Sequence, residues 1–92
     1  MNKNLFDFKN KTAVITGGAQ GFGLDIAKRF LEGGAKVVIW DIDSKLLEKV
    51  LNNINNDNLT SNVVDVSNYK TVEDAVNKIL KNSNIDICLL YT

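Results

Sequence analysis

The sequence predicts an α/β domain built on a parallel, doubly wound sheet, and three observations lead to this fold class. Short β-type runs alternate along the chain with longer segments of helical periodicity, in the order β-α-β-α-β-α-β. The run at residues 36–40 lacks polar alternation, which is typical of a strand buried on both faces. The length of 92 residues allows a single domain. Strands that alternate with helices in this way are joined by right-handed crossovers.

The β-type runs and the helical segments follow one another without a linker. The β-type runs cover residues 13–16, 36–40, 59–64 and 85–90. Apolar residues at helical spacing predict the intervening helices at residues 22–32, 46–54 and 72–80. Gly33-Gly34 is typical of the end of the first helix. Asp43 or Ser44 is expected to cap the second helix, and Ser67 the third.

Several large or reactive side chains are expected in the core of this domain. Cys88 stands between two apolar residues of the last β-type run, so it is expected to pack in the core and not to act as a nucleophile. The core residues predicted in this way include Phe30, Trp40, Val63, Val64, Leu80 and Cys88.

Composition argues against several classes of function. Eleven basic and eleven acidic residues cancel, and the lysines are scattered, so nothing favours nucleic acid or a membrane surface. No apolar run approaches the roughly 18 residues of a membrane-spanning helix, and residues 1–8 lack the apolar region of a secretory signal. A single cysteine and the absence of histidine argue against a disulfide and a zinc site. These features favour a cytoplasmic protein without a metal.

A glycine-rich turn lies between the first predicted strand and the first predicted helix. Gly17, Gly21 and Gly23 have the spacing G-x-x-x-G-x-G. Glycine permits the backbone angles of a tight turn, lets a phosphate approach the main chain, and lets the helix pack closely on the strand. The start of the helix then presents N–H groups and a positive dipole end to an anion. The turn is a candidate pyrophosphate site, with a ligand-free tight turn as the alternative.

Two aspartates follow the next two predicted strands. Asp41 ends the second strand twenty residues after Gly21, where a dinucleotide fold places the carboxylate that binds ribose. This carboxylate would repel a 2′-phosphate, and neither Ile42 nor Asp43 supplies a compensating positive charge, so the pattern predicts NAD and not NADP. Asp65 follows the third strand and is expected to face the same crevice. Each aspartate has an alternative role as an ordinary loop or capping residue.

Other nucleotide-binding patterns do not match the glycine turn. A Walker loop requires Lys and then Ser or Thr after its last glycine, whereas Leu24-Asp25 stand there. The strict G-x-G-x-x-G spacing is also absent. A methyltransferase-type domain remains an alternative, because it too places glycines after the first strand and an acid after the second. Thr16 before the glycines and the pair Asp65-Val66 argue against it.

With these motifs the chain resembles the short-chain dehydrogenase/reductase family. Residues 11–23 resemble the T-G-x-x-x-G-[I/F]-G loop of that family, and residues 35–41 resemble its second strand with the NAD-selecting aspartate. Residues 64–66 are similar to its D-V pair, whose aspartate binds the adenine amino group. Residues 85–87 are similar to the start of its D-[I/V]-L-V-N-N-A-G strand. The resemblance covers almost the whole chain and implies a Rossmann-type sheet with strand order 3-2-1-4.

The resemblance also implies a cofactor, NAD, and a set of residues that would hold its adenosine and pyrophosphate. These residues are Thr16, Gly17, Ala19, Gln20, Gly21, Phe22, Gly23, Asp41, Ile42, Asp65 and Val66.

The sequence departs from the family at its end. Residues 90–92 replace the family's N-N-A-G, and the catalytic serine and Tyr-x-x-x-Lys pair of the family lie beyond that point. Tyr69 has Glu73 four residues later where the family has lysine. We therefore expect residues 1–92 to be a truncated, partial NAD-binding domain of a 3-oxoacyl reductase or an alcohol or sugar dehydrogenase, without detectable hydride transfer. The alternatives are an NAD-binding subunit completed by a separate catalytic chain, and a non-catalytic nucleotide-binding domain.

The implied strand order leaves the fourth strand at an edge of the sheet. An apolar edge strand without a neighbour is a site of association. Self-association through the fourth strand is therefore expected alongside NAD(H) binding.

Overall fold

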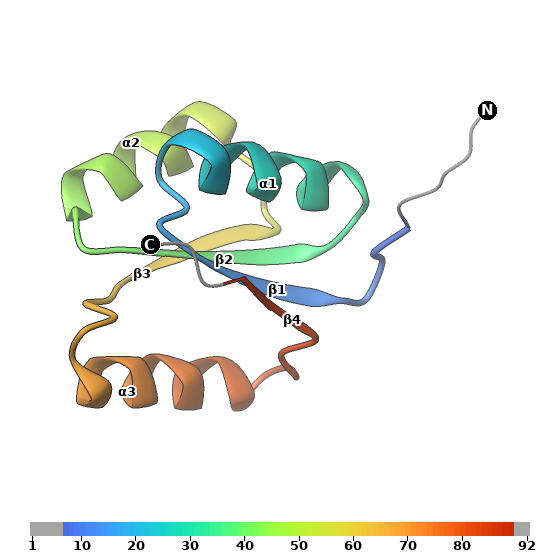
Figure 1. Cartoon of the computed structure of the whole chain (residues 1–92). Coiled ribbons are helices and arrows are strands. Elements are labelled where there is room, and N and C mark those ends of the chain that lie inside the picture. The colour runs from blue at the N-terminus through green and yellow to red at the C-terminus, as the bar shows by residue number, and fades with distance from the viewer. Residues whose placement is uncertain (1–6, 90–92) are drawn as a thin grey trace.

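The computed structural model describes residues 7–89. The elements are β1 (Thr12–Thr16), α1 (Gly21–Glu32), β2 (Lys36–Asp41), α2 (Ser44–Ile54), β3 (Leu59–Val63), α3 (Tyr69–Leu80) and β4 (Ile87–Leu89). The strands form one parallel sheet in the order β3-β2-β1-β4. Parallel neighbours require crossovers, and each crossover here contains one helix. Figure 1 shows α1 and α2 on one face of the sheet and α3 on the other. The predicted doubly wound fold and its strand order are confirmed.

Two clusters of buried side chains hold the layers together, one on each face of the sheet. The larger cluster joins Ile15 of β1 and Ile39 of β2 to α1 and α2. The smaller cluster joins Val14 and Trp40 to Ala75 of α3. Successive residues of a strand point to opposite faces, so the buried run of β1 supplies both clusters. Across residues 7–89, no helix is long and apolar enough to span a membrane.

Local hydrogen bonds set the ends of the helices. The Asp43 carboxylate accepts a hydrogen bond from the Leu46 N–H at 3.1 Å, so the predicted cap of α2 is confirmed. Gly33 caps the end of α1 as predicted. The prediction of Ser67 as the cap of α3 is wrong by one residue, because the Asn68 side chain accepts from the first-turn N–H groups. The Ser67 hydroxyl instead donates to Asp65 at 2.6 Å.

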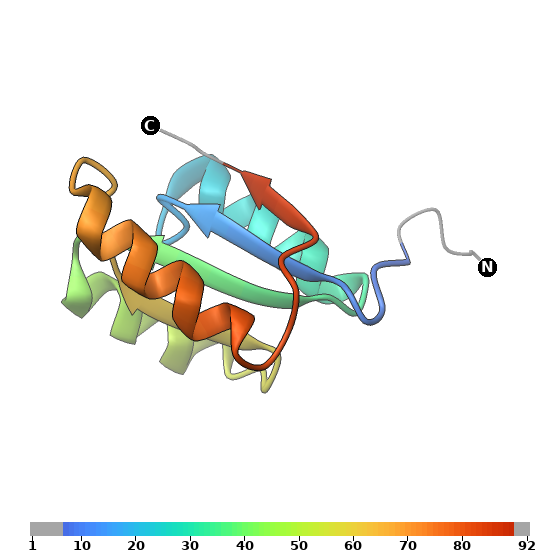
Figure 2. The same cartoon turned by 90° about the horizontal axis from the view of Figure 1, so that it is seen from below.

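Three of the core predictions are wrong, because the residues are exposed. Each of these residues lies at an edge of the sheet or at the end of a helix. Cys88 is exposed, because β4 is an edge strand within the described chain (Figure 2). Val63 is 57 % exposed at the end of β3, which is the opposite edge. Leu80 is 49 % exposed at the last position of α3. Trp40 and Val64 are buried as predicted, and residue 90 of the fourth run lies outside the described residues.

The start of α1 packs directly against the turn that follows β1. A Cβ at Gly23 would lie 2.4 Å from the main-chain oxygen of Gly17, so no side chain fits between the helix and the turn. At Gly21 a Cβ would meet nothing within 4 Å, although the backbone there has φ +61°. The two glycines are therefore required for different reasons, close approach at Gly23 and backbone angle at Gly21.

These two reasons predict different costs for an added methyl group. Gly23→Ala should destabilise the fold by about 3 kcal/mol or more, because the turn must move. Gly21→Ala should cost only about 1–2 kcal/mol, the penalty of a left-handed backbone for a residue with a Cβ. Urea unfolding followed by circular dichroism measures both changes. Equal losses of stability in the two variants would contradict the close approach at Gly23.

Candidate functional site

The carboxyl ends of β1, β2 and β3 surround a cleft of about 250 Å³. Parallel strands point the same way, so the residues that follow them meet at one edge of the sheet. The predicted binding residues Thr16, Gly17, Asp41, Ile42, Asp65 and Val66 all line this cleft. The remaining predicted residues belong to the turn and to the first turn of α1, next to Gly17.

The glycine turn is held by the main chain of the neighbouring strand. The N–H groups of Gly17 and Gly18 both donate to the main-chain oxygen of Trp40, at 2.7 and 3.3 Å. Gly17 has φ +65°, a left-handed conformation that glycine adopts without strain. The turn is thereby fixed to β2 directly before Asp41.

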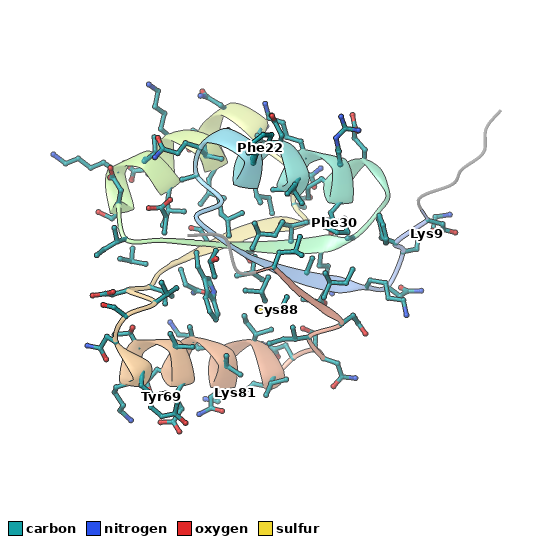
Figure 3. The ribbon with its side chains drawn as sticks, viewed as in Figure 1. Lys9, Phe22, Phe30, Tyr69, Lys81 and Cys88 are labelled. Carbon is teal, nitrogen blue, oxygen red and sulfur yellow. The ribbon has the colours of Figure 1, made fainter. Side chains whose placement is uncertain are left out.

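The first turn of α1 is open to an anion. Its N-cap residue, Gln20, has extended backbone, makes no capping hydrogen bond through its side chain, and is followed by no acidic residue in the first turn. The positive end of the helix dipole is therefore not compensated by a carboxylate from that turn. Gln20, Gly21 and Phe22 are exposed there, and Figure 3 labels Phe22 at the start of α1.

Two of the predicted binding residues are buried and do not line the cleft. Ala19 is only 2 % exposed and packs in the larger cluster. Gly23 is buried against the main chain of the turn. Both residues shape the turn and α1, and the structure gives them no surface toward the cleft.

Asp41 combines a structural role with a position in the cleft. Its carboxylate oxygen Oδ1 accepts the N–H of Asp43 at 3.1 Å, which folds the start of the loop before α2. Its main-chain oxygen accepts the N–H of Val64 at 3.0 Å, so β2 and the end of β3 are tied together beside the cleft. No hydrogen bond from the described residues ends on Oδ2, which leaves this oxygen for a ligand.

Asp65 accepts two hydrogen bonds from Ser67. Oδ1 of Asp65 accepts the Ser67 hydroxyl at 2.6 Å and the Ser67 N–H at 2.9 Å. The hydroxyl bond first and the N–H bond second lower the pKa of the Asp65 carboxyl below its ordinary value. At neutral pH this carboxylate is therefore only an acceptor of hydrogen bonds.

The structure adds two cleft residues to those predicted from the sequence. Trp40 and Val64 were assigned to the core, and they are 2 % and 3 % exposed, yet both also line the cleft. Their positions directly before Asp41 and Asp65 are the sequence signal that indicates this second role. Gly18 serves packing, because a Cβ there would lie 2.6 Å from Cγ2 of Ile39.

Replacing Ser67, which donates the hydroxyl hydrogen bond, should change the pKa of Asp65. In Ser67→Ala the pKa of Asp65 should rise toward its ordinary value, because the larger of the two hydrogen-bond contributions is lost. Since the folded-state pKa is lowered, Asp65 stabilises the fold above its unfolded pKa of about 3.9. That contribution disappears as pH falls through the folded-state pKa.

Carbon-13 NMR titration of the Asp65 carboxyl in both proteins measures the shift. Thr71→Val is the control, because Thr71 donates to the main-chain oxygen of Asp65 and not to its carboxylate. An Asp65 pKa that is the same in Ser67→Ala and in the unaltered chain would contradict this assignment.

Comparison with known proteins gives the same family throughout. A family model described as short chain dehydrogenase matches residues 11–90. A short-chain dehydrogenase reductase (3c) of Arabidopsis thaliana is 40 % identical over 80 residues, which are 86 % of this chain and 31 % of the relative. A 3-oxoacyl-[acyl-carrier-protein] reductase of Chlamydia pneumoniae is 39 % identical over 80 residues, 84 % of this chain and 32 % of the relative.

A solved structure agrees with these relatives in fold. The crystal structure of a 3-ketoacyl-(acyl-carrier-protein) reductase from Brucella melitensis, complexed with NADH, matches with a TM-score of 0.81 and 40 % identity. The match covers 89 % of this chain and 34 % of that chain. The chain thus spans about a third of the length of the relatives it matches. The chain belongs to the short-chain dehydrogenase/reductase family, whose N-terminal part it matches.

Proposed function

We propose that this chain binds NAD(H) through the cleft at the carboxyl ends of β1, β2 and β3, as the cofactor-binding part of an oxidoreductase. The observation that carries the proposal is the position of the Asp41 carboxylate beside the glycine turn, in one cleft. When bound, NAD would supply a hydride acceptor or donor, and the residues described here would hold its adenosine and pyrophosphate.

Each part of the site offers a group suited to one part of a dinucleotide. The uncompensated start of α1 and the open space at Gly21 suit a pyrophosphate. The Asp41 carboxylate suits the ribose hydroxyls, and the ionised Asp65 suits the amino group of adenine. Ile42 and Val66 are 67 % and 47 % exposed and offer an apolar surface to the base.

Charge favours NAD over NADP in this proposal. The 2′-phosphate of NADP would lie beside the Asp41 carboxylate, and the two negative charges would repel each other. Among the described residues that line the cleft, none is basic, so nothing there compensates the repulsion.

The proposal includes the reaction class of the parent enzyme but places no catalytic residue within residues 1–92. The reductase relatives favour a 3-oxoacyl reductase or an alcohol or sugar dehydrogenase type. The serine, tyrosine and lysine of the reaction would come from residues beyond these, or from a separate chain. We place the protein in the cytoplasm, because an exposed single thiol at Cys88 suits a reducing compartment.

Removing the charge of Asp41 tests this function. Asp41→Asn keeps an oxygen that can accept the Asp43 N–H but removes the carboxylate. Hydrogen bonds to a charged group contribute about 1.5–3 kcal/mol, so the dissociation constant for NADH should rise by about tenfold or more. The preference for NADH over NADPH should shrink at the same time. Isothermal titration calorimetry with both cofactors measures these constants.

Asp43→Asn is the matched control for this experiment. It makes the same change two residues away, keeps an amide oxygen for the cap of α2, and does not alter a cleft-lining residue. NADH binding in this variant should stay within about twofold of the unaltered chain. The proposal fails if the unaltered chain shows no saturable NADH binding, or if both variants weaken it equally.

We further propose that two copies of the chain associate through the outer edge of β4. This strand pairs with β1 on one side, and no strand of the described chain pairs with its other side. Ile87 and Leu89 are half-buried, while Cys88 between them is exposed; Figure 3 labels Cys88 on this strand. A twofold axis perpendicular to the sheet, midway between the two copies of β4 and level with Cys88, would make the two strands antiparallel and bring the two Cys88 residues opposite each other.

This arrangement predicts a disulfide between copies under mild oxidation. Directly opposite residues have Cβ atoms about 4.5–5.5 Å apart, and small adjustments allow a bond between the two sulfurs. Sedimentation velocity should show a dimer whose fraction rises with concentration, and oxidation should trap it covalently. Cys88→Ser should keep the reversible dimer without the covalent bond, and Cys88→Lys should abolish both. A monomer at all concentrations would contradict the proposal.

A further inference from the structure

Trp40 connects the nucleotide cleft to an edge of the sheet. In the register of the strands it lies opposite Thr16 of β1 on one side and Asn62 of β3 on the other. Its main-chain oxygen accepts the N–H groups of Gly17 and Gly18. Its side chain is 2 % exposed, and its indole Nε1 donates to Oδ1 of Asn62 at 3.2 Å. One residue therefore bonds the turn through its main chain and β3 through its side chain.

The hydrogen bond to Asn62 fixes the orientation of a large buried ring. A buried indole N–H needs an acceptor, and leaving it without one costs more than the bond itself contributes. Parallel strands in this register point Trp40 and Asn62 to the same face, where Asn62 also borders the grooves beside α3. Without the Asn62 oxygen the indole would have to turn toward water to satisfy its N–H.

Displacement of the Trp40 indole would change the geometry of the cleft. Trp40 lines the cleft beside Gly17 and Asp41, and its main-chain oxygen accepts the N–H of Gly17. Asn62 itself does not line the cleft. Any effect of Asn62 on a ligand must therefore pass through Trp40 or through the strand.

We propose that Asn62 is a positioning residue of the nucleotide cleft, which holds the glycine turn in its binding geometry through Trp40. This inference rests on the proposed NAD(H) function, because it concerns the same cleft. The hydrogen bond of Asn62 fixes the indole, the indole fixes the end of β2, and the main-chain oxygen of Trp40 fixes the N–H groups of Gly17 and Gly18.

The test compares variants that differ in whether they keep the acceptor. Asn62→Leu removes the acceptor at nearly the same volume, and Asn62→Asp keeps an acceptor oxygen. Thr60→Val is the matched control on β3, because Thr60 lies opposite Val38 and borders the same groove without a bond to Trp40. Trp40→Phe removes the donor, retains an aromatic ring, and serves as a second disrupting variant if Asn62→Leu does not fold.

The first readout is independent of any ligand. Amide hydrogen exchange at Gly17 and Gly18, followed by NMR, should become about tenfold faster in Asn62→Leu and in Trp40→Phe. The indole N–H signal is unambiguous because the chain has one tryptophan, and it should shift in Asn62→Leu. Asn62→Asp should restore both signals toward those of the unaltered chain, and Thr60→Val should leave them unchanged.

The second readout is the dissociation constant for NADH by calorimetry. It should rise about fivefold in Asn62→Leu and recover to within about twofold in Asn62→Asp. If Asn62→Leu lowers the melting temperature but leaves glycine exchange and NADH affinity as in Thr60→Val, Asn62 is merely structural and the inference is overturned. Failure of Asn62→Asp to restore glycine exchange overturns it as well. Amide exchange at Gly17 and Gly18 can respond as expected although neither the unaltered chain nor any variant binds NADH. In that case Asn62 does position the glycine turn, and the proposed NAD(H) function is wrong.

Discussion

The close approach of α1 to the turn after β1 is the constraint on which the rest of the site depends. A helix start presents its dipole to the carboxyl end of the sheet only if it begins directly above the strand that it follows. Here the backbone of Gly23 lies so close to Gly17 that a Cβ would be 2.4 Å from the Gly17 oxygen. The same turn is fixed from the side by Trp40, whose oxygen accepts both N–H groups of Gly17 and Gly18. Helix, turn and second strand are thus joined by close packing and main-chain hydrogen bonds.

Parallel topology then brings separate parts of the sequence to this unit. Asp41 and Asp65 follow different strands, yet both line the cleft beside Gly17, because β1, β2 and β3 end on the same side of the sheet. The local bonds of the two aspartates differ. Asp41 uses one oxygen to shape the loop before α2, while Ser67 lowers the pKa of Asp65 through two hydrogen bonds to one of its oxygens. The two carboxylates that line the cleft therefore differ in their local hydrogen bonds.

Both edges of the described sheet carry exposed side chains that the sequence pattern assigned to the core. Val63 ends β3 at one edge, and β4 at the other edge has an exposed Cys88 between half-buried neighbours. The relatives of this chain are about three times as long as the part that matches. The described residues that line the cleft all lie between positions 16 and 66.

Periodicity and turn chemistry are local properties, so they sufficed to predict the order of the elements, the glycine turn, a cap of α2 at Asp43 or Ser44, and the two aspartates after strands. The strand order was implied by the resemblance to the family, and six of the eleven predicted binding residues line the cleft. Which strand residues are covered depends on tertiary contacts that no local pattern contains. Cys88 has apolar neighbours in sequence, but its exposure depends on whether another strand lies beside β4. The same holds for Asn62 and Trp40, which are 22 residues apart and bond only because β2 and β3 pair in one register.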